Sequence, residues 1–116
     1  MKTIGNAGST ARKLEAVASG ALPNGQPVIV NADGTVSVVG GGNLTSENYI
    51  GIAKGAAADG TSAVVQTGCS INDAQSGLTA GQDYYVQTDG TLGLTAADPS
   101  VLAGTAVSAT KIIVKG

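Results

Sequence analysis

The chain reads Leu22-Pro23-Asn24-Gly25-Gln26-Pro27-Val28-Ile29-Val30-Asn31-Ala32-Asp33-Gly34-Thr35-Val36 and, 56 positions later, Leu78-Thr79-Ala80-Gly81-Gln82-Asp83-Tyr84-Tyr85-Val86-Gln87-Thr88-Asp89-Gly90-Thr91-Leu92. Both copies follow Leu-x-x-Gly-Gln-x-x-x-Val-x-x-Asp-Gly-Thr without a gap and end in an apolar residue. Asp-Gly between two strand-like runs is a strong hairpin signal, because a type I′ turn needs positive φ at both central residues. Each copy is therefore predicted to form a β-hairpin with a type I′ turn at its tip.

Further strand-like segments surround the two hairpins. Apolar or alternating runs predict strands over residues 13–19, 26–31, 35–39, 49–54, 61–67, 82–88, 91–95, 101–107 and 111–115. A helix over 11–18 is the alternative for the first segment, because its helix propensities are good. A strand is preferred there because everything that follows is β. The segment 68–76 is ambiguous, since its apolar alternation is interrupted by residues that favour turns.

The repeat predicts both the fold class and the domain organisation. Each hairpin is followed, after a loop, by a similar segment, Ile50-Gly51-Ile52-Ala53 or Ala103-Gly104-Thr105-Ala106. Short strands at this spacing predict an all-β fold, a small β-barrel or sandwich built from two related β-hairpin units. We expect a flexible or partner-ordered N-terminal arm over residues 1–12. A single β domain should cover 13–116, with pseudo-repeats at about 13–60 and 61–116.

The composition limits the core and argues against several classes of function. Among 116 residues there are 18 Gly and three Tyr but no Phe or Trp, so a monomer should be marginally stable and should gain stability from copies of itself or from a larger partner. Only 12% of the residues are charged, with a net charge of −2, which does not resemble a nucleic-acid-binding surface. The sequence has no apolar run of the roughly 18 residues that a transmembrane helix needs. Its first residues do not resemble a signal peptide.

Residues that could carry chemistry are few. The chain has no His, so a Cys/His zinc site is excluded and Cys69 has no activating base. We interpret Cys69 as a small buried residue. Asp33, Asp59 and Asp89 each precede Gly-Thr, and turn formation is preferred to a metal-binding or catalytic role because Asp hydrogen-bonds its own backbone. No catalytic residue, metal or cofactor is expected, and the protein is not expected to be an enzyme.

The N-terminal arm is the first candidate for contact with a partner. Half of the basic residues fall in the first 13 positions, namely Lys2, Arg12 and Lys13, and Ile4 belongs to the same candidate set. Such an arm suits docking onto an acidic surface. A solvated tail is the alternative interpretation.

The three tyrosines are the second candidates. Tyr84 and Tyr85 are neighbours on a predicted strand, so their rings point to opposite faces of the sheet. One ring is expected in the core and the other at a subunit interface, where Tyr is enriched. Tyr49 is a further interface candidate.

Several segments of the chain resemble a module of tailed-bacteriophage virion proteins. The resemblance is carried by residues 50–60 (IGIAKGAAADG), 77–86 (GLTAGQDYYV), 89–92 (DGTL) and 103–111 (AGTAVSATK). It covers roughly residues 48–116, and the first half resembles the module more loosely. The module recurs in capsid decoration (cement) proteins and in head and tail fibre proteins. A free-standing chain of 116 residues fits a decoration protein better, because fibre proteins usually carry the module within a longer chain.

The resemblance implies a structural role on the virion. The expected protein binds the outer surface of the assembled phage head as a homotrimer, with the major capsid protein as partner, and stabilises the shell. Its capsid contacts would come from the arm through Lys2, Ile4, Arg12 and Lys13, and the chain would be made in the host bacterial cytoplasm. The family contributes no catalytic residue, and neither nucleic acid nor membrane is expected as a partner. The alternative is a head or tail fibre module that engages a host-surface receptor or glycan through Tyr and Asn side chains.

Overall fold

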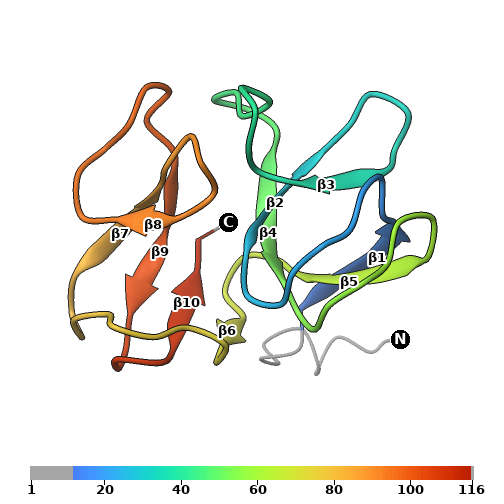
Figure 1. The fold of residues 1–116 in the computed structure, drawn as a ribbon. Coiled ribbons are helices and arrows are strands. Elements are labelled where there is room, and N and C mark those ends of the chain that lie inside the picture. Colours follow the sequence, from blue (N-terminus) through green and yellow to red (C-terminus); the bar gives the residue numbers. More distant parts are fainter. Residues whose placement is uncertain (1–11, 116) are drawn as a thin grey trace, which may run out of the picture.

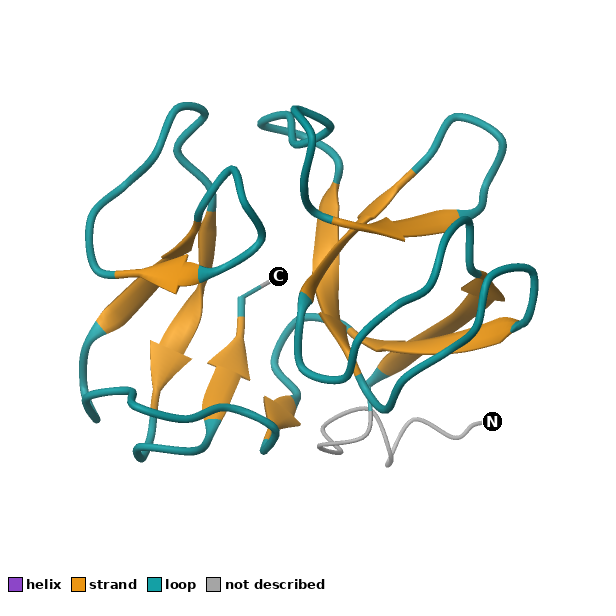
Figure 2. Ribbon diagram, viewed as in Figure 1, coloured by secondary structure: helices purple, strands orange, loops and turns teal. Residues whose placement is uncertain are grey.

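The computed structural model describes residues 12–115, and all regular structure in this part of the chain is β (Figures 1 and 2). Its ten strands are β1 (Lys13–Val17), β2 (Pro27–Val30), β3 (Val36–Val38), β4 (Tyr49–Ala53), β5 (Ser62–Gln66), β6 (Ile71–Asn72), β7 (Asp83–Val86), β8 (Leu92–Gly93), β9 (Leu102–Ala106) and β10 (Ile112–Val114). They form two five-stranded antiparallel sheets, so the predicted all-β class is confirmed. Each of the nine predicted segments contains one strand, and the ambiguous segment contains the two-residue β6.

The two sheets have the same topology. The strand order is β1-β5-β4-β2-β3 in the first sheet and β6-β10-β9-β7-β8 in the second, so each strand of the first has its counterpart five strands later. Three of these five correspondences could be recognised in the sequence: those of the two hairpin strands, β2 with β7 and β3 with β8, and that of the strand after the hairpin, β4 with β9. The first sheet ends at Gln66, because β5 pairs with both β1 and β4, and the second begins at Ile71. The change from one repeat to the next thus falls a few residues after the expected boundary near residue 60.

The two hairpin tips are built alike, but the type I′ prediction was wrong. The N–H of Gly34 donates to the carbonyl of Asn31 at 3.0 Å, and the N–H of Asn31 donates to the carbonyl of Thr35 at 2.8 Å. The same bonds recur 56 positions later. Gly34 and Gly90 have φ of +88°, whereas no Asp in residues 12–115 has positive φ. The tip is therefore a type I turn followed by a left-handed Gly, the usual three-residue hairpin loop.

The Asp side chains explain why this turn forms. The carboxylate of Asp33 accepts hydrogen bonds from the N–H of Thr35 at 3.1 Å and from its hydroxyl at 2.6 Å, and Asp89 binds Thr91 in the same way at 3.0 and 2.7 Å. The turn interpretation is confirmed for both residues. Asp59 acts differently, because its carboxylate accepts the N–H of Gly20 at 2.8 Å and so joins the β4–β5 loop to the segment after β1.

The repeated Gly-Gln pair attaches each hairpin to the strand that follows it. Gly25 has φ of +82° and donates its N–H to the carbonyl of Ala53 at 3.0 Å, while the N–H of Ala53 donates to the carbonyl of Gln26 at 2.9 Å. Gly81, Gln82 and Ala106 repeat both bonds at 2.8 and 3.0 Å. A residue in the left-handed region turns the backbone here without the steric cost that a side chain would add.

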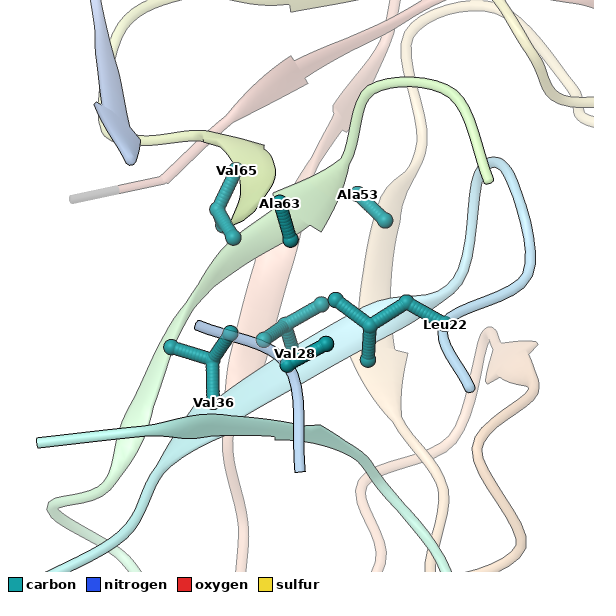
Figure 3. Packing of buried hydrophobic residues seen from close by; sticks show 7 residues of the cluster. Leu22, Val28, Val36, Ala53, Ala63 and Val65 are labelled. Atoms are coloured by element: carbon teal, nitrogen blue, oxygen red, sulfur yellow. The ribbon is translucent and has the colours of Figure 1, made fainter. Parts of the chain in front are cut away.

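Each sheet curls around its own apolar cluster. The first cluster consists of Ala18, Leu22, Val28, Val36, Ala53, Ala63 and Val65, and its labelled members converge between β2, β3 and β5 (Figure 3). A bridge between Ala18 and Val36 brings the end of β1 against β3 and closes this sheet. The second cluster consists of Tyr84, Ala106, Ile112, Val114 and Ile52, with Leu78 and Leu92 packed against it. Ile52 belongs to β4, so the first sheet contributes to the core of the second.

Candidate functional site

The joint between the sheets is a mixed apolar and polar surface. Ile29 of β2, together with Val39 and Leu44, packs in one cluster with Val86, Val101 and Ala103 of the second half. The hydroxyl of Tyr49 donates to the carbonyl of Ala103 at 3.2 Å. Burial raises the pKa of the Tyr49 phenol far above its ordinary value of 10.0, because the phenolate would lose its hydration. The role of Tyr49 within the chain is therefore to hold β4 against β9.

Three amide side chains complete this joint. Asn72 is 1% exposed, and its Nδ2 donates to Oε1 of Gln66 at 2.8 Å. Its Oδ1 accepts from the N–H of Ala74 at 3.0 Å and from Nε2 of Gln75 at 2.9 Å. Gln75 in turn donates to the carbonyl of Gly25 at 2.9 Å. Because buried amides are costly unless they are paired, this network fixes how the two sheets meet.

A cleft of about 300 Å³ lies beside this network. It is lined by Gly25, Gln26, Pro27, Ala74, Gln75, Ser76, Leu78, Gly90, Thr91 and Leu92, so both repeats contribute. None of its lining residues is charged, and none is a tyrosine. The cleft suits a small uncharged ligand that offers hydroxyl or amide groups.

The structure separates the predicted tyrosines. Tyr84 is 5% exposed, packs in the core of the second sheet and accepts the N–H of Thr79 at 2.8 Å through its hydroxyl oxygen. Tyr85 lies on the opposite face and is half-buried. One ring of the pair was predicted to lie in the core, and it is that of Tyr84. The interface role remains a prediction for Tyr85.

The arm residues are only partly described. Lys2 and Ile4 lie outside the described residues. The carbonyl of Arg12 accepts the N–H of Thr67 at 3.2 Å, and Lys13 begins β1 with an exposed side chain. β1 is the end strand in its sheet order, and four of its five residues are exposed, including Leu14 at 40% and Val17 at 48%. The segment that enters the domain here is therefore continuous with an exposed strand.

The structure assigns no chemical role to the carboxylates or to Cys69. Within residues 12–115, no three Cys, Asp or Glu side chains gather as a metal site would require. The hydrogen bonds from Thr35 and Thr91 lower the pKa values of Asp33 and Asp89 below 3.8, as expected of turn residues. Cys69 is exposed, so its expected burial was wrong. Its N–H donates to the carbonyl of Val114 at 2.7 Å, and it adopts a φ of +71°.

One exposed surface of the second sheet was not predicted from the sequence. Pairing across the second sheet places Ile71, Ile113, Thr105 and Asp83 in one row, with Tyr85 and Leu102 opposite one another in the next. We call these six residues the outer face of the second sheet. Ile71 and Ile113 are 38% and 39% exposed. The only sequence signal was the alternation around Ile112-Ile113-Val114, which does not reveal which side is covered.

Comparisons with protein-family models and with curated proteins find no match to this chain. For the described part of the chain, no helix has the length and apolar character needed to cross a membrane.

Proposed function

We propose that the chain is a capsid decoration protein of a tailed bacteriophage. It attaches as a homotrimer to the outer surface of the assembled head, with the major capsid protein as its partner. Its role is mechanical rather than enzymatic. A protein that binds the assembled shell, but not its dissociated subunits, stabilises the shell by mass action.

The observation that carries the proposal is the exposed β1 strand and the segment that precedes it. Lys13 is exposed on β1, and Arg12 lies immediately before it, so basic groups mark the point where the arm meets the domain. Leu14 and Val17 add apolar surface on the same short strand. Arg12 and Lys13 outnumber the exposed Glu15 of the same strand, so the strip is net basic and partly apolar, which suits attachment to an acidic protein shell. In the proposal, Lys2 and Ile4 extend this contact.

The arm is tested with phage heads that lack this chain. Purified full-length protein should bind these heads and raise the temperature at which they rupture. A variant without residues 1–11 keeps Arg12, whose carbonyl bonds to Thr67, and should fold but no longer bind. Head binding by this variant at the level of the full chain would remove the arm from the proposal.

A matched pair of charge variants sharpens the test. Lys2→Ala with Lys13→Ala should weaken head binding by about tenfold, as expected for the loss of two exposed ion pairs. Lys111→Ala with Lys115→Ala removes the same charge at the other end of the chain, from exposed positions, and should bind as the unmodified protein does. Equal losses in both pairs would indicate general charge attraction instead of arm docking.

A fibre module that engages a host-surface glycan is the second candidate. The uncharged cleft lined by Gln26, Gln75 and Thr91 favours it, although none of the tyrosines expected for this role lines the cleft. Phage that lack a fibre should fail at adsorption while their heads stay heat-stable. Phage that lack a decoration protein should adsorb normally and rupture at lower temperature. The deletion phenotype thus separates the two functions.

A further inference from the structure

Asn24-Gly25 in the first repeat is the single Asn-Gly pair of the sequence. Such a pair can rearrange, because glycine has no side chain to hinder the attack of its nitrogen on the preceding side-chain amide. The second repeat has Ala80-Gly81 at the same place, so the turn itself does not need an asparagine. Each of the other asparagines precedes a residue with a side chain; they are Asn6, Asn31, Asn43, Asn48 and Asn72.

The rearrangement is a hydrolysis that proceeds through a cyclic imide. The nitrogen of Gly25 loses its proton and forms a bond to Cγ of Asn24, while the bond from Cγ to Nδ2 breaks and ammonia leaves. Water then opens the imide at either carbonyl and gives an aspartyl or an isoaspartyl residue. Water is thus the one co-reactant, and no atom is oxidised or reduced.

Both reacting groups are held by the end of β4 and the loop after it. The N–H of Gly25 donates to the carbonyl of Ala53 at 3.0 Å, which opposes the loss of its proton. Oδ1 of Asn24 accepts the N–H of Gly55 at 2.8 Å, so the amide is bound to the loop between β4 and β5. The imide can therefore form only after residues 22–26 separate from residues 53–57.

The second repeat holds the same turn at the joint between the sheets. Gly25 is buried, and Nε2 of Gln75 donates to its carbonyl at 2.9 Å. A Cβ on Gly25 would lie 2.6 Å from the carbonyl oxygen of Ala74, so the two repeats are in close contact here. An isoaspartyl linkage would add one carbon to the backbone at this point, for which the packed joint has no room. Its formation should therefore loosen the joint permanently.

The three Asp-Gly pairs are weaker candidates for the same reaction. A carboxylate must be protonated before it can lose an oxygen as water, and hydrogen bonds from Thr35 and Thr91 lower the pKa of two of these carboxylates. The amide of Asn24 is neutral and needs no such protonation. The glycine N–H groups of the three pairs also donate to backbone carbonyls, at 3.0, 2.8 and 3.0 Å for Gly34, Gly60 and Gly90.

We propose that Asn24 is a deamidation site that stays closed while the joint between the sheets is intact. Local opening of residues 22–26 exposes the site, in the way that local opening exposes a protected amide to hydrogen exchange. The isoaspartyl product then keeps the joint from closing again. The inference does not depend on the proposed function, because it concerns the chain alone.

Peptide mass spectrometry after incubation of the full chain at mildly alkaline pH measures the conversion of Asn24. In guanidinium chloride, Asn24 should convert faster than every other asparagine. Under native conditions its conversion should be slower by about tenfold or more, because only the open fraction of the chain reacts. Native conversion as fast as in guanidinium chloride would overturn the proposal. Faster conversion of another asparagine in the unfolded chain would overturn it as well.

Two glutamine variants test the control by the joint. Gln75→Ala removes the donor to the carbonyl of Gly25 and should accelerate native conversion about fivefold, as expected for the loss of one hydrogen bond. Gln82→Ala is the matched control, because the exposed side chain of Gln82 takes no part in the joint, and it should convert as the unmodified chain does. A folded Gln75→Ala protein that converts no faster than Gln82→Ala would show that the joint does not protect the site.

A third variant covers the case in which Gln75→Ala fails to fold. Asn24→Ala gives the first repeat the residue that Ala80 supplies in the second, so the turn should still form. In guanidinium chloride this variant should release far less ammonia than the unmodified chain. Equal release would place the reaction at another residue and overturn the proposal.

Discussion

Gly51 and Gly104 show at the scale of single residues how closely the two repeats correspond. A Cβ on Gly51 would lie 2.0 Å from the carbonyl oxygen of Gln66, and one on Gly104 would lie 2.0 Å from that of Ile113. Both acceptors are backbone atoms of the neighbouring strand, which cannot rotate away. Glycine is therefore required at the same point of β4 and β9, where the next strand approaches most closely.

Replacing either glycine by Ala should destabilise the protein by about 3 kcal/mol or more, since the backbone of a paired strand has to move. Gly40→Ala is the control, because a Cβ there meets no atom within 4 Å, and it should change stability by less than about 0.5 kcal/mol. Urea denaturation followed by circular dichroism measures all three variants. A Gly104→Ala protein as stable as Gly40→Ala would contradict the steric explanation.

The turn carboxylates make stability depend on acidity. The folded state lowers the pKa values of Asp33 and Asp89, so the stabilisation that they add is present above their ordinary pKa of 3.8 and is lost as the pH falls below it. Asp33→Asn with Asp89→Asn keeps an acceptor for each Thr but removes the titration. This variant should lose less stability between neutral pH and pH 2.5 than the unmodified chain loses.

Asp73→Asn serves as the control for this titration, since the exposed Asp73 makes no hydrogen bond to other residues in 12–115 through its carboxylate. Its melting temperature should follow that of the unmodified chain at every pH. If the turn double variant and the control show the same pH dependence, the turns are not the source of the acid sensitivity.

At the scale of elements, the short strand β6 contributes through one buried side chain. Asn72 joins β6 to Gln66 of β5 and to the loop that carries Gln75, so it connects the sheets where the chain crosses between them. Asn72→Ala would leave Oε1 of the buried Gln66 without its donor. We expect a loss of about 1–3 kcal/mol in the free energy of unfolding, measured by denaturant titration.

Gln82→Ala is the matched control for Asn72→Ala, because the exposed side chain of Gln82 takes no part in this network. It should alter the free energy of unfolding by less than about 0.5 kcal/mol. An Asn72→Ala protein that matches it would show that water replaces the lost amide.

Nine of the ten strands could be predicted from the sequence, but the repeat could be recognised only in the hairpins and in the strand after each of them. The repeated Leu, Gly-Gln and Asp-Gly-Thr positions form core contacts and turns that depend on nearby residues, so both copies retain a recognisable pattern. β1 and β6 show no such pattern. The pairing places Lys13 and Leu14 of β1 at the same positions as Ile71 and Asn72 of β6. The residue types differ because β1 is largely exposed to solvent, whereas Asn72 is buried in the joint between the sheets.

The residues of the candidate site were harder to predict from the sequence than the hairpins were, for a related reason. Tyr84 and Tyr85 were correctly expected on opposite faces, since alternation on a strand is local. The open outer face depends instead on which sheet packs on which, a property of distant contacts. Cys69 was misplaced because the typical burial of free Cys says nothing about a residue held in a crossing loop.

At the scale of the whole molecule, the two repeats differ in how far each forms its own core. The first sheet closes around its own cluster through the bridge between Ala18 and Val36. The second completes its cluster with Ile52 from the first. We therefore expect the first repeat to stabilise the second more than the second stabilises the first, through the interface that joins neighbouring units in repeat proteins.

Separate halves test this asymmetry. A peptide of residues 67–116 should lack cooperative unfolding and show poorly dispersed amide NMR signals, because the surface that Ile29 and Ile52 cover is open to water. Adding residues 1–66 in excess should restore dispersion. A well-dispersed spectrum for 67–116 alone would show that the second sheet needs no support from the first.

The exposed thiol of Cys69 is a site at which a probe for distance measurements can be attached. As the only cysteine in the sequence, it accepts one spin label without any substitution, and it lies beside Val114 at the end of β10. Two labelled copies in contact would then report a single inter-label distance by pulsed electron paramagnetic resonance. On a symmetric shell, that distance would recur at every equivalent contact and so give the spacing of the copies directly.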